Sequence, residues 1–84
     1  MFSIIYKKSA EKELLNLPRG YAIKIRKAIN KLADNPHPAG TKKLAGNMNA
    51  YRLRIGNYRV IYTIESNQLM IFIIKIAHRR EVYR

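Results

Sequence analysis

The chain has 84 residues, which is enough for one domain with a single modest core. It carries 17 Lys and Arg residues against 5 Asp and Glu residues, so its formal net charge is +12. Charge of this size predicts a polyanionic partner, such as nucleic acid, an anionic membrane surface or an acidic protein. The sequence contains no cysteine, which excludes disulfides and cysteine-ligated metals, and its longest apolar run, 69–74, is too short to span a bilayer.

The first part of the chain predicts one strand followed by two helices. Residues 2–7 are rich in Ile and aromatic side chains, which favour a strand. A short helix is expected from Ser9, as its N-cap, to about Asn16, and a second helix from Arg19 to about Asp34. Neither helix is long enough to be stable alone, so we expect a helical hairpin packed against a sheet. The apolar stripe of the second helix is formed by Ala22, Ile25, Ile29 and Leu32.

A loop is expected from Asn35 to Asn49, because Pro and Gly residues recur along it. It carries Lys42 and Lys43, and loops of this kind often hold binding residues on a scaffold. Lysines and an arginine also line the second helix, where they form either a solvated face or a track for a phosphate backbone. The dilysine is a candidate nucleic-acid contact.

Residues 50–64 contain the clearest pattern in the chain. Both before and after Gly56-Asn57, every second side chain is apolar or aromatic and most of those between are Arg or Thr, which is the alternation of half-buried strands. Gly at the first loop position supplies the positive φ of a type II′ turn, so the two runs form a hairpin with a two-residue loop. Such a loop fixes the register, and cross-strand partners follow by counting outward from Ile55 opposite Tyr58.

This register divides the hairpin into an apolar face and a basic face. The basic face carries Arg52, Arg54 and Arg59, with Arg54 directly opposite Arg59. Like charges in this position cost about several tenths of a kcal/mol, and no acidic residue of the hairpin offsets them. The cluster therefore indicates an anion-binding site, with a charged face that protects a strand edge as the alternative. The expected core face consists of Tyr51, Leu53, Ile55, Tyr58, Val60 and Tyr62.

A last strand is expected from Gln68 to Ala77, after a tight turn at Ser66-Asn67. Its apolar run lacks polar alternation, which predicts a central strand covered on both faces. The fold class is thus α+β with the element order β-α-α-β-β-β. We expect a four-stranded, all-antiparallel sheet in the order first–fourth–third–second. Lys75 would lie on the core face or beside the arginines, depending on the length of the preceding loop.

Arginines, with a histidine and a tyrosine near the C-terminus, are the side chains best suited to chemistry. The sequence lacks paired carboxylates, a Gly-rich phosphate loop and a histidine cluster, so we expect neither a metal nor a cofactor. Arginines with His and Tyr suit metal-free RNA cleavage, in which the ribose 2′-OH attacks the adjacent phosphate. Arginine binds phosphate but does not release its proton, so the proton carrier is expected to be His78, Tyr83 or Lys75.

Three segments in this order resemble the RelE/ParE toxin superfamily, and its RelE branch in particular. They are YRLRI from Tyr51, GNYRVIY from Gly56 and HRREVYR from His78. The resemblance covers essentially the whole chain, 1–84, as a single domain. It implies a type II toxin that cleaves mRNA in the ribosomal A site without a metal, and a RelB-like antitoxin protein that wraps and blocks the toxin. We expect a cytoplasmic protein with no membrane partner.

The resemblance also assigns catalytic residues. Arg59 matches the arginine that stabilises the phosphate, and Arg79 matches the arginine after the last strand, with Arg80 as the competing alignment. Tyr83 matches the tyrosine that orients the RNA. The resemblance does not assign His78, which is instead the best local substitute as a proton carrier because its reference pKa lies near neutrality, with a hydrogen-bonded histidine at the strand end as the alternative.

The remaining basic residues are expected to bind the flanking RNA backbone. Arg52 and Arg54 stand where well-known members carry lysines, and this departure removes two groups that can exchange a proton. The expected RNA-binding set is Arg52, Arg54, Lys42, Lys43 and Arg80.

Three other interpretations compete with an mRNA endonuclease. One is a ParE-like, non-enzymatic inhibitor of DNA gyrase, a branch that generally lacks the basic residues and the tyrosine. Another is a basic RNA-binding module, which would explain the charge without a need for Tyr83. A membrane-surface protein ranks last, because its helices would carry bulky aromatic side chains, and here only Tyr21 does.

Overall fold

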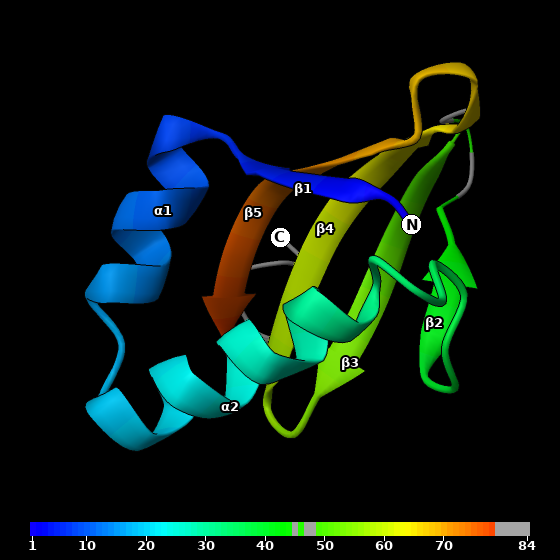
Figure 1. Ribbon diagram of the computed structural model, residues 1–84. Coiled ribbons are helices and arrows are strands. Elements are labelled where there is room, and N and C mark those ends of the chain that lie inside the picture. Colours follow the sequence, from blue (N-terminus) through cyan, green and yellow to red (C-terminus); the bar gives the residue numbers. More distant parts are fainter. Residues whose placement is uncertain (45, 47–48, 79–84) are drawn as a thin grey trace.

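The computed structural model describes residues 1–44, 46 and 49–78. These residues form a five-stranded sheet with two helices on one of its faces (Figure 1). The strand order is β1-β5-β4-β3-β2. In chain order the elements are β1 (Ser3–Tyr6), α1 (Lys8–Leu15), α2 (Arg19–Lys31), β2 (Thr41–Lys43), β3 (Ala50–Ile55), β4 (Tyr58–Glu65), a 3₁₀ turn (Ser66–Gln68) and β5 (Met70–His78).

The two helices confirm the expected elements but correct their ends. Lys7, not Ser9, precedes the first turn of α1, because its N–H still bonds to Ile73 O at the end of β1 and its backbone is extended. No side chain caps this helix. α2 ends at Lys31 rather than near Asp34. The N–H groups of Leu32, Ala33 and Asp34 bond to carbonyl groups three residues earlier, which makes a tighter turn.

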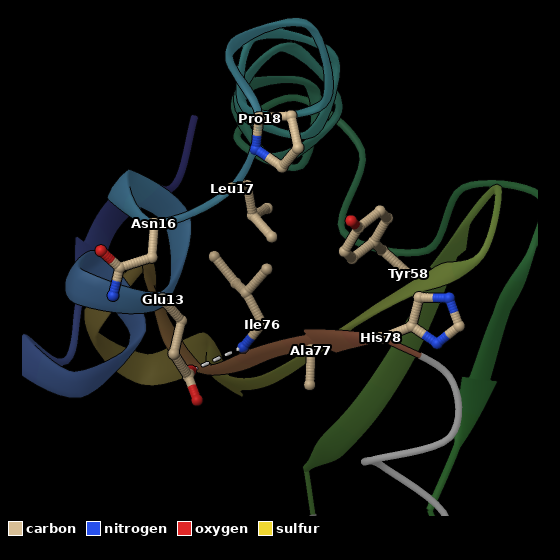
Figure 2. A pocket seen from close by; sticks show the side chains of 8 residues that line it. All are labelled: Glu13, Asn16, Leu17, Pro18, Tyr58, Ile76, Ala77 and His78. Carbon is tan, nitrogen blue, oxygen red and sulfur yellow. Dashed lines mark hydrogen bonds between the residues drawn. The ribbon is translucent and has the colours of Figure 1, made fainter.

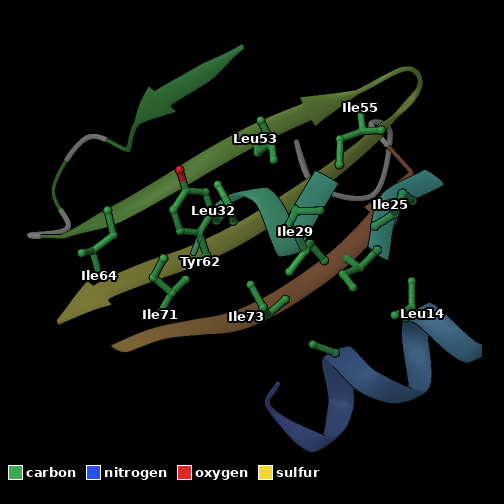
Figure 3. Packing of buried hydrophobic residues seen from close by; sticks show 13 residues of the cluster. Leu14, Ile25, Ile29, Leu32, Leu53, Ile55, Tyr62, Ile64, Ile71 and Ile73 are labelled. Carbon is green, nitrogen blue, oxygen red and sulfur yellow. The ribbon is translucent and has the colours of Figure 1, made fainter. Parts of the chain in front are cut away.

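The core lies between the helices and the sheet (Figure 3). The predicted stripe on α2 is confirmed, since Ile25, Ile29 and Leu32 are fully buried, while Ala22 packs at the margin of the core. Tyr62 is also fully buried, and its hydroxyl donates a 2.6 Å hydrogen bond to Pro36 O. In the described part of the chain, no helix combines the length and apolar character that a membrane crossing needs.

The hairpin register is confirmed over its whole length. Ile55 pairs with Tyr58 across Gly56-Asn57, and the pairing continues to Tyr51 opposite Tyr62 and beyond. Gly56 has φ +59°, as the first position of a type II′ turn requires. The expected core face is turned toward the helices, with Leu53, Ile55, Val60 and Tyr62 buried and Tyr51 and Tyr58 packed against them.

The α+β class and the neighbour order of the four expected strands are confirmed, but two details of the sheet were wrong. A fifth strand, β2, forms inside the segment 35–49, where a loop was expected, and pairs antiparallel with β3. β1 pairs parallel, not antiparallel, with β5, so the sheet is mixed. Both differences depend on long-range contacts, which local sequence patterns do not record.

The connection between β4 and β5 is longer than the expected tight turn at Ser66-Asn67. It consists of the 3₁₀ turn and Leu69, which adopts a left-handed conformation with φ +53°. The pairing then shifts by one residue at an irregularity between Ile61 and Tyr62. As a result, Lys75 lies opposite Ile61, on the face of the sheet that carries the arginines.

Candidate nucleic-acid interface

The face of the sheet opposite the helices carries a row of basic residues. The cross-strand pairs align Lys42 on β2 with Arg52 on β3, then Ile61 on β4 and Lys75 on β5. Neighbouring strands are about 4.8 Å apart, so the row crosses the sheet in about 15 Å. Lys42 is exposed, and Arg52 is half-buried.

A second row lies nearer the Gly56-Asn57 turn and brings two arginines together. Arg54 pairs directly with Arg59, which in turn pairs with Ala77 on β5. Lys42, Arg52, Arg54 and Arg59 therefore share one side of the sheet, which we call the basic face. Such a cluster can bind several phosphate oxygens at once, because arginine and lysine present multiple donors.

Arg59 differs from its partner in burial. Arg54 is exposed, whereas Arg59 is only 4% exposed. Its guanidinium Nη1 donates to the main-chain oxygens of Tyr58 at 3.1 Å and Gly56 at 3.4 Å. These bonds hold the charge at the turn end of the sheet, so a phosphate can reach it only if neighbouring side chains move.

Two other predicted site residues lie on the helix side of the sheet. Lys43 is exposed but pairs with Tyr51, so it does not join Lys42 on the basic face. His78 pairs with Tyr58, and their ring centroids are 5.5 Å apart in an edge-to-face contact. The structure thus brings His78 to the same end of the sheet as Arg59 but onto the opposite face. Three further predicted residues lie outside the described part of the chain: Arg79, Arg80 and Tyr83.

A pocket of about 470 Å³ opens beside His78, between the end of β5 and the corner that joins α1 to α2 (Figure 2). The sequence patterns did not predict it. Its lining residues come from segments far apart in the sequence: Glu13, Asn16, Leu17, Pro18, Tyr58, Ile76, Ala77 and His78.

Like Asn16, Glu13 is an unpredicted polar residue of this pocket. Its Oε1 accepts a 2.9 Å hydrogen bond from the Ile76 N–H, and its Oε2 lies 3.0 Å from Lys75 Nζ. One signal was available in the sequence, because Glu13 lies three residues after Ala10 and next to Leu14, at the border of the buried stripe of α1.

The two tyrosines whose pKa values are raised, Tyr6 and Tyr62, do not belong to the basic face. Burial raises the pKa of Tyr62, which lies in the core, and burial also raises the pKa of Tyr6 on β1, partly offset by the Arg26 charge. Within the residues that the structure describes, no group of three or more His, Cys, Asp or Glu side chains could hold a metal ion.

Another cluster of cations lies on α2. Lys24, Lys27 and Lys31 rim a separate cavity of about 350 Å³ against Leu53 and Ile55 of β3. The positive charge is therefore spread over both sides of the molecule. The basic face differs in that its cations stand on adjacent, paired strands of one sheet.

Comparison with known proteins identifies the family. Residues 4–83 match the family described as the ParE toxin of type II toxin-antitoxin system, parDE. The putative toxin RelE1 of Methanocaldococcus jannaschii is 34% identical over 86 aligned residues, which cover 99% of this chain and 96% of that protein. Toxin RelE3 of the same organism is 30% identical, with coverage of 95% and 93%.

A solved structure gives the same result. The chain is similar to one in the archaeal RelE-RelB complex from Pyrococcus horikoshii OT3, with a TM-score of 0.83, 29% identity and coverage of 93% and 94%. The fold, the order of the elements and the sequence similarity extend over nearly the whole chain. The chain therefore belongs to the RelE/ParE superfamily of toxins from type II toxin–antitoxin systems.

Proposed function

We propose that this toxin is a metal-independent endoribonuclease that cleaves mRNA on the ribosome and so inhibits translation. The observation that carries the proposal is the basic face, where Arg52, Arg54 and Arg59 stand together on β3 and β4 next to Lys42. An arginine pair directly across two strands lowers stability, and an RNA phosphate would relieve this repulsion. The relatives named as RelE proteins support the same class.

In this proposal, arginine stabilises the charge that develops on the scissile phosphate. Arg59 and Arg79 contact the phosphate, and the 2′-OH of the preceding ribose is the nucleophile. Tyr83 orients the RNA, and His78 or Tyr83 transfers the proton. The ring of His78 lies on the helix side, so RNA would have to pass around the end of the sheet to meet both His78 and Arg59.

The other basic residues are proposed to bind the backbone on either side of the cleaved bond. Arg54 and Lys42 are exposed and suited to phosphate contacts, and ribosomal RNA is a second source of such phosphates. Because Lys43 faces the other side of β2, it would contact a different part of the bound RNA from Lys42. The proposed set is Arg52, Arg54, Lys42, Lys43 and Arg80.

We also propose a RelB-like antitoxin as the protein partner. The structure of the Pyrococcus horikoshii relative is that of a RelE-RelB complex, and the charge of +12 favours a partner with acidic segments. A toxin that acts on ribosomes would work in the cytoplasm. If recognition is electrostatic, the affinity of the antitoxin should fall as salt rises.

The test is a reconstituted translation reaction with a defined mRNA, with and without ribosomes, assayed for new 3′ ends. We expect cleavage only on ribosomes, and none when the scissile nucleotide carries a 2′-deoxyribose. Arg59→Ala and Arg79→Ala should each abolish cleavage, whereas Lys12→Ala removes the same charge from exposed α1 and should not. Unchanged cleavage by both arginine variants would overturn the site assignment.

A second candidate is a ParE-like inhibitor of DNA gyrase, which the match to the ParE toxin family favours. It predicts intact mRNA and reduced gyrase supercoiling when folded toxin is added. A supercoiling assay with the same preparation decides between the two. Binding of RNA without either effect would instead favour a plain RNA-binding module.

A further inference from the structure

A cluster of two aromatic rings and a lysine lies at the β2 edge of the sheet, on the side that carries the helices. Lys43 on β2 pairs with Tyr51 on β3, so the two side chains are neighbours on that side. The loop between α2 and β2 brings the ring of His37 to 4.9 Å from the ring of Tyr51, with 72° between the ring planes. We call His37, Lys43 and Tyr51 the edge cluster, because β2 is the outermost strand (Figure 1).

The edge cluster is held in place from the core. Tyr51 stacks on the fully buried ring of Tyr62, with 5.8 Å between the centroids and 25° between the planes. The Tyr62 hydroxyl donates to Pro36 O, directly before His37. The N–H of His37 in turn donates to Asn35 Oδ1 at 3.1 Å. The imidazole of His37 therefore has a defined position although the residue is exposed.

The edge cluster offers two groups that bind single-stranded nucleotides. His37 and Lys43 are both exposed, whereas Tyr51 is half-buried. An accessible ring is a surface on which any unpaired base can stack, because every base has a π-face. A lysine beside the ring can bind the phosphate of the same nucleotide. The edge cluster thus combines a stacking surface with a phosphate-binding cation.

The edge cluster also continues the basic face around the edge of the sheet. Lys42 and Lys43 are consecutive on β2, and Lys42 lies on the basic face while Lys43 lies on the helix side. A single strand of RNA that leaves the basic face at β2 therefore meets Lys43 next. We propose that the edge cluster is a second nucleotide site, in which His37 stacks on an unpaired base, Tyr51 supports the ring and Lys43 binds the phosphate. This inference rests on the proposed RNA substrate.

A pair of variants at His37 tests the stacking. His37→Leu removes the π-face and His37→Phe keeps it, while both remove the imidazole nitrogens. Fluorescence anisotropy measures the affinity of the free toxin for a short labelled RNA, once as a single strand and once as a duplex. His37→Leu should bind the single strand at least about fivefold more weakly than His37→Phe does, because stacking of one base contributes about that factor or more. The two variants should bind the duplex equally, since its bases are already stacked on one another.

Two results of this experiment would overturn the inference. One is equal affinity of both His37 variants for the single strand. The other is a loss of affinity that is the same for the single strand and the duplex, since it would report a general change of the loop rather than stacking. The ring signals of Tyr62 in NMR spectra verify separately that each variant keeps the core next to the loop.

A second pair of variants tests the phosphate contact. Lys43→Gln should reduce the slope of log affinity against log salt concentration by about 0.7, which is the value for one phosphate contact with a single strand. Lys12→Gln removes the same charge from exposed α1 and should leave the slope unchanged. A slope that falls equally in both variants would mean that net charge alone is responsible, and it would overturn the role of Lys43.

The two proposals fail differently. Binding of single-stranded RNA that depends on His37, by a toxin that leaves ribosomal mRNA intact, would remove the proposed nuclease function but not the edge cluster. Cleavage on ribosomes by a toxin whose His37→Leu and His37→Phe variants bind RNA equally would remove the edge cluster alone. Photoreactive thiouridine in the mRNA identifies the source of the nucleotide on the ribosome. Crosslinks to residues 35–43 would indicate mRNA, and protection of a ribosomal nucleotide that is lost in His37→Leu would indicate ribosomal RNA.

Discussion

The two faces of the sheet use the same strands but differ in what their side chains contact. On the helix side, Leu53 and Val60 are buried against the helices. On the other side, Arg54 and Arg59 stand opposite one another in the same strands. One face stabilises the fold by apolar burial, while the other destabilises it by placing like charges together. The alternation in β3 and β4 thus separates the residues that stabilise the fold from those available for binding.

The largest difference between the faces should appear in unfolding experiments. Ile29 is fully buried, so Ile29→Ala should lower the free energy of unfolding by about 2–5 kcal/mol. Arg54 is exposed, and Arg54→Ala should change the free energy of unfolding by less than about 0.5 kcal/mol. Urea denaturation measures both. An equal loss for the two variants would contradict the division between a stabilising face and a binding face.

A smaller effect should come from the one polar atom that Tyr62 brings into the core. Tyr62→Phe removes the hydrogen bond to Pro36 O but keeps the ring, so it should cost about 1 kcal/mol. Tyr21→Phe, at an exposed ring on α2, serves as the control. If both variants unfold at the same urea concentration as the parent protein, the bond does not contribute to stability.

Charge reversal on the basic face should raise stability while it weakens binding. Arg54→Glu replaces a repulsive pair with Arg59 by an attractive one, which is worth about 0.2–1 kcal/mol. Its affinity for single-stranded RNA, and the salt dependence of that affinity, should both fall. Lys12→Glu makes the same charge change on α1. Equal losses of RNA affinity in the two variants would mean that only net charge matters.

The smallest effect is a loss of stability at alkaline pH, and it belongs to the helix side. Burial raises the pKa of Tyr62, so the folded state resists ionisation that the unfolded chain undergoes near pH 10. The contribution of the un-ionised Tyr62 to the free energy of unfolding is complete below about pH 10, and it is lost as the pH rises through the pKa of Tyr62 in the folded state. Urea midpoints measured across this range should fall less steeply for Tyr62→Phe than for the parent protein.

The parts of the fold that were predicted correctly depend on local rules. A two-residue loop at Gly56-Asn57 fixes the register of β3 and β4, so both faces followed by counting. The buried stripe of α2 likewise follows from helical periodicity. These rules involve only neighbours in the sequence, which is why the arginines of the basic face could be predicted from the sequence alone.

The parts that were missed depend on long-range contacts. β2 is three residues long and shows too little alternation to be recognised, and it pairs with β3 from within a loop. The parallel direction of β1 depends on the path of the chain through both helices. The shift of register near Ile61 put Lys75 on the basic face and His78 opposite Tyr58, and a count along β5 could not give either position.

Glu13 has a consequence for the outer edge of the sheet. β1 is short and its pairing with β5 reaches only Ile73, so the remainder of β5 would present main-chain groups to any extended segment nearby. The carboxylate already accepts the Ile76 N–H, and Lys75 holds it there. A foreign strand that aligned with this part of β5 would first have to displace an ion pair. The side chain that borders the pocket therefore also occupies a main-chain donor of β5 that an added strand would need.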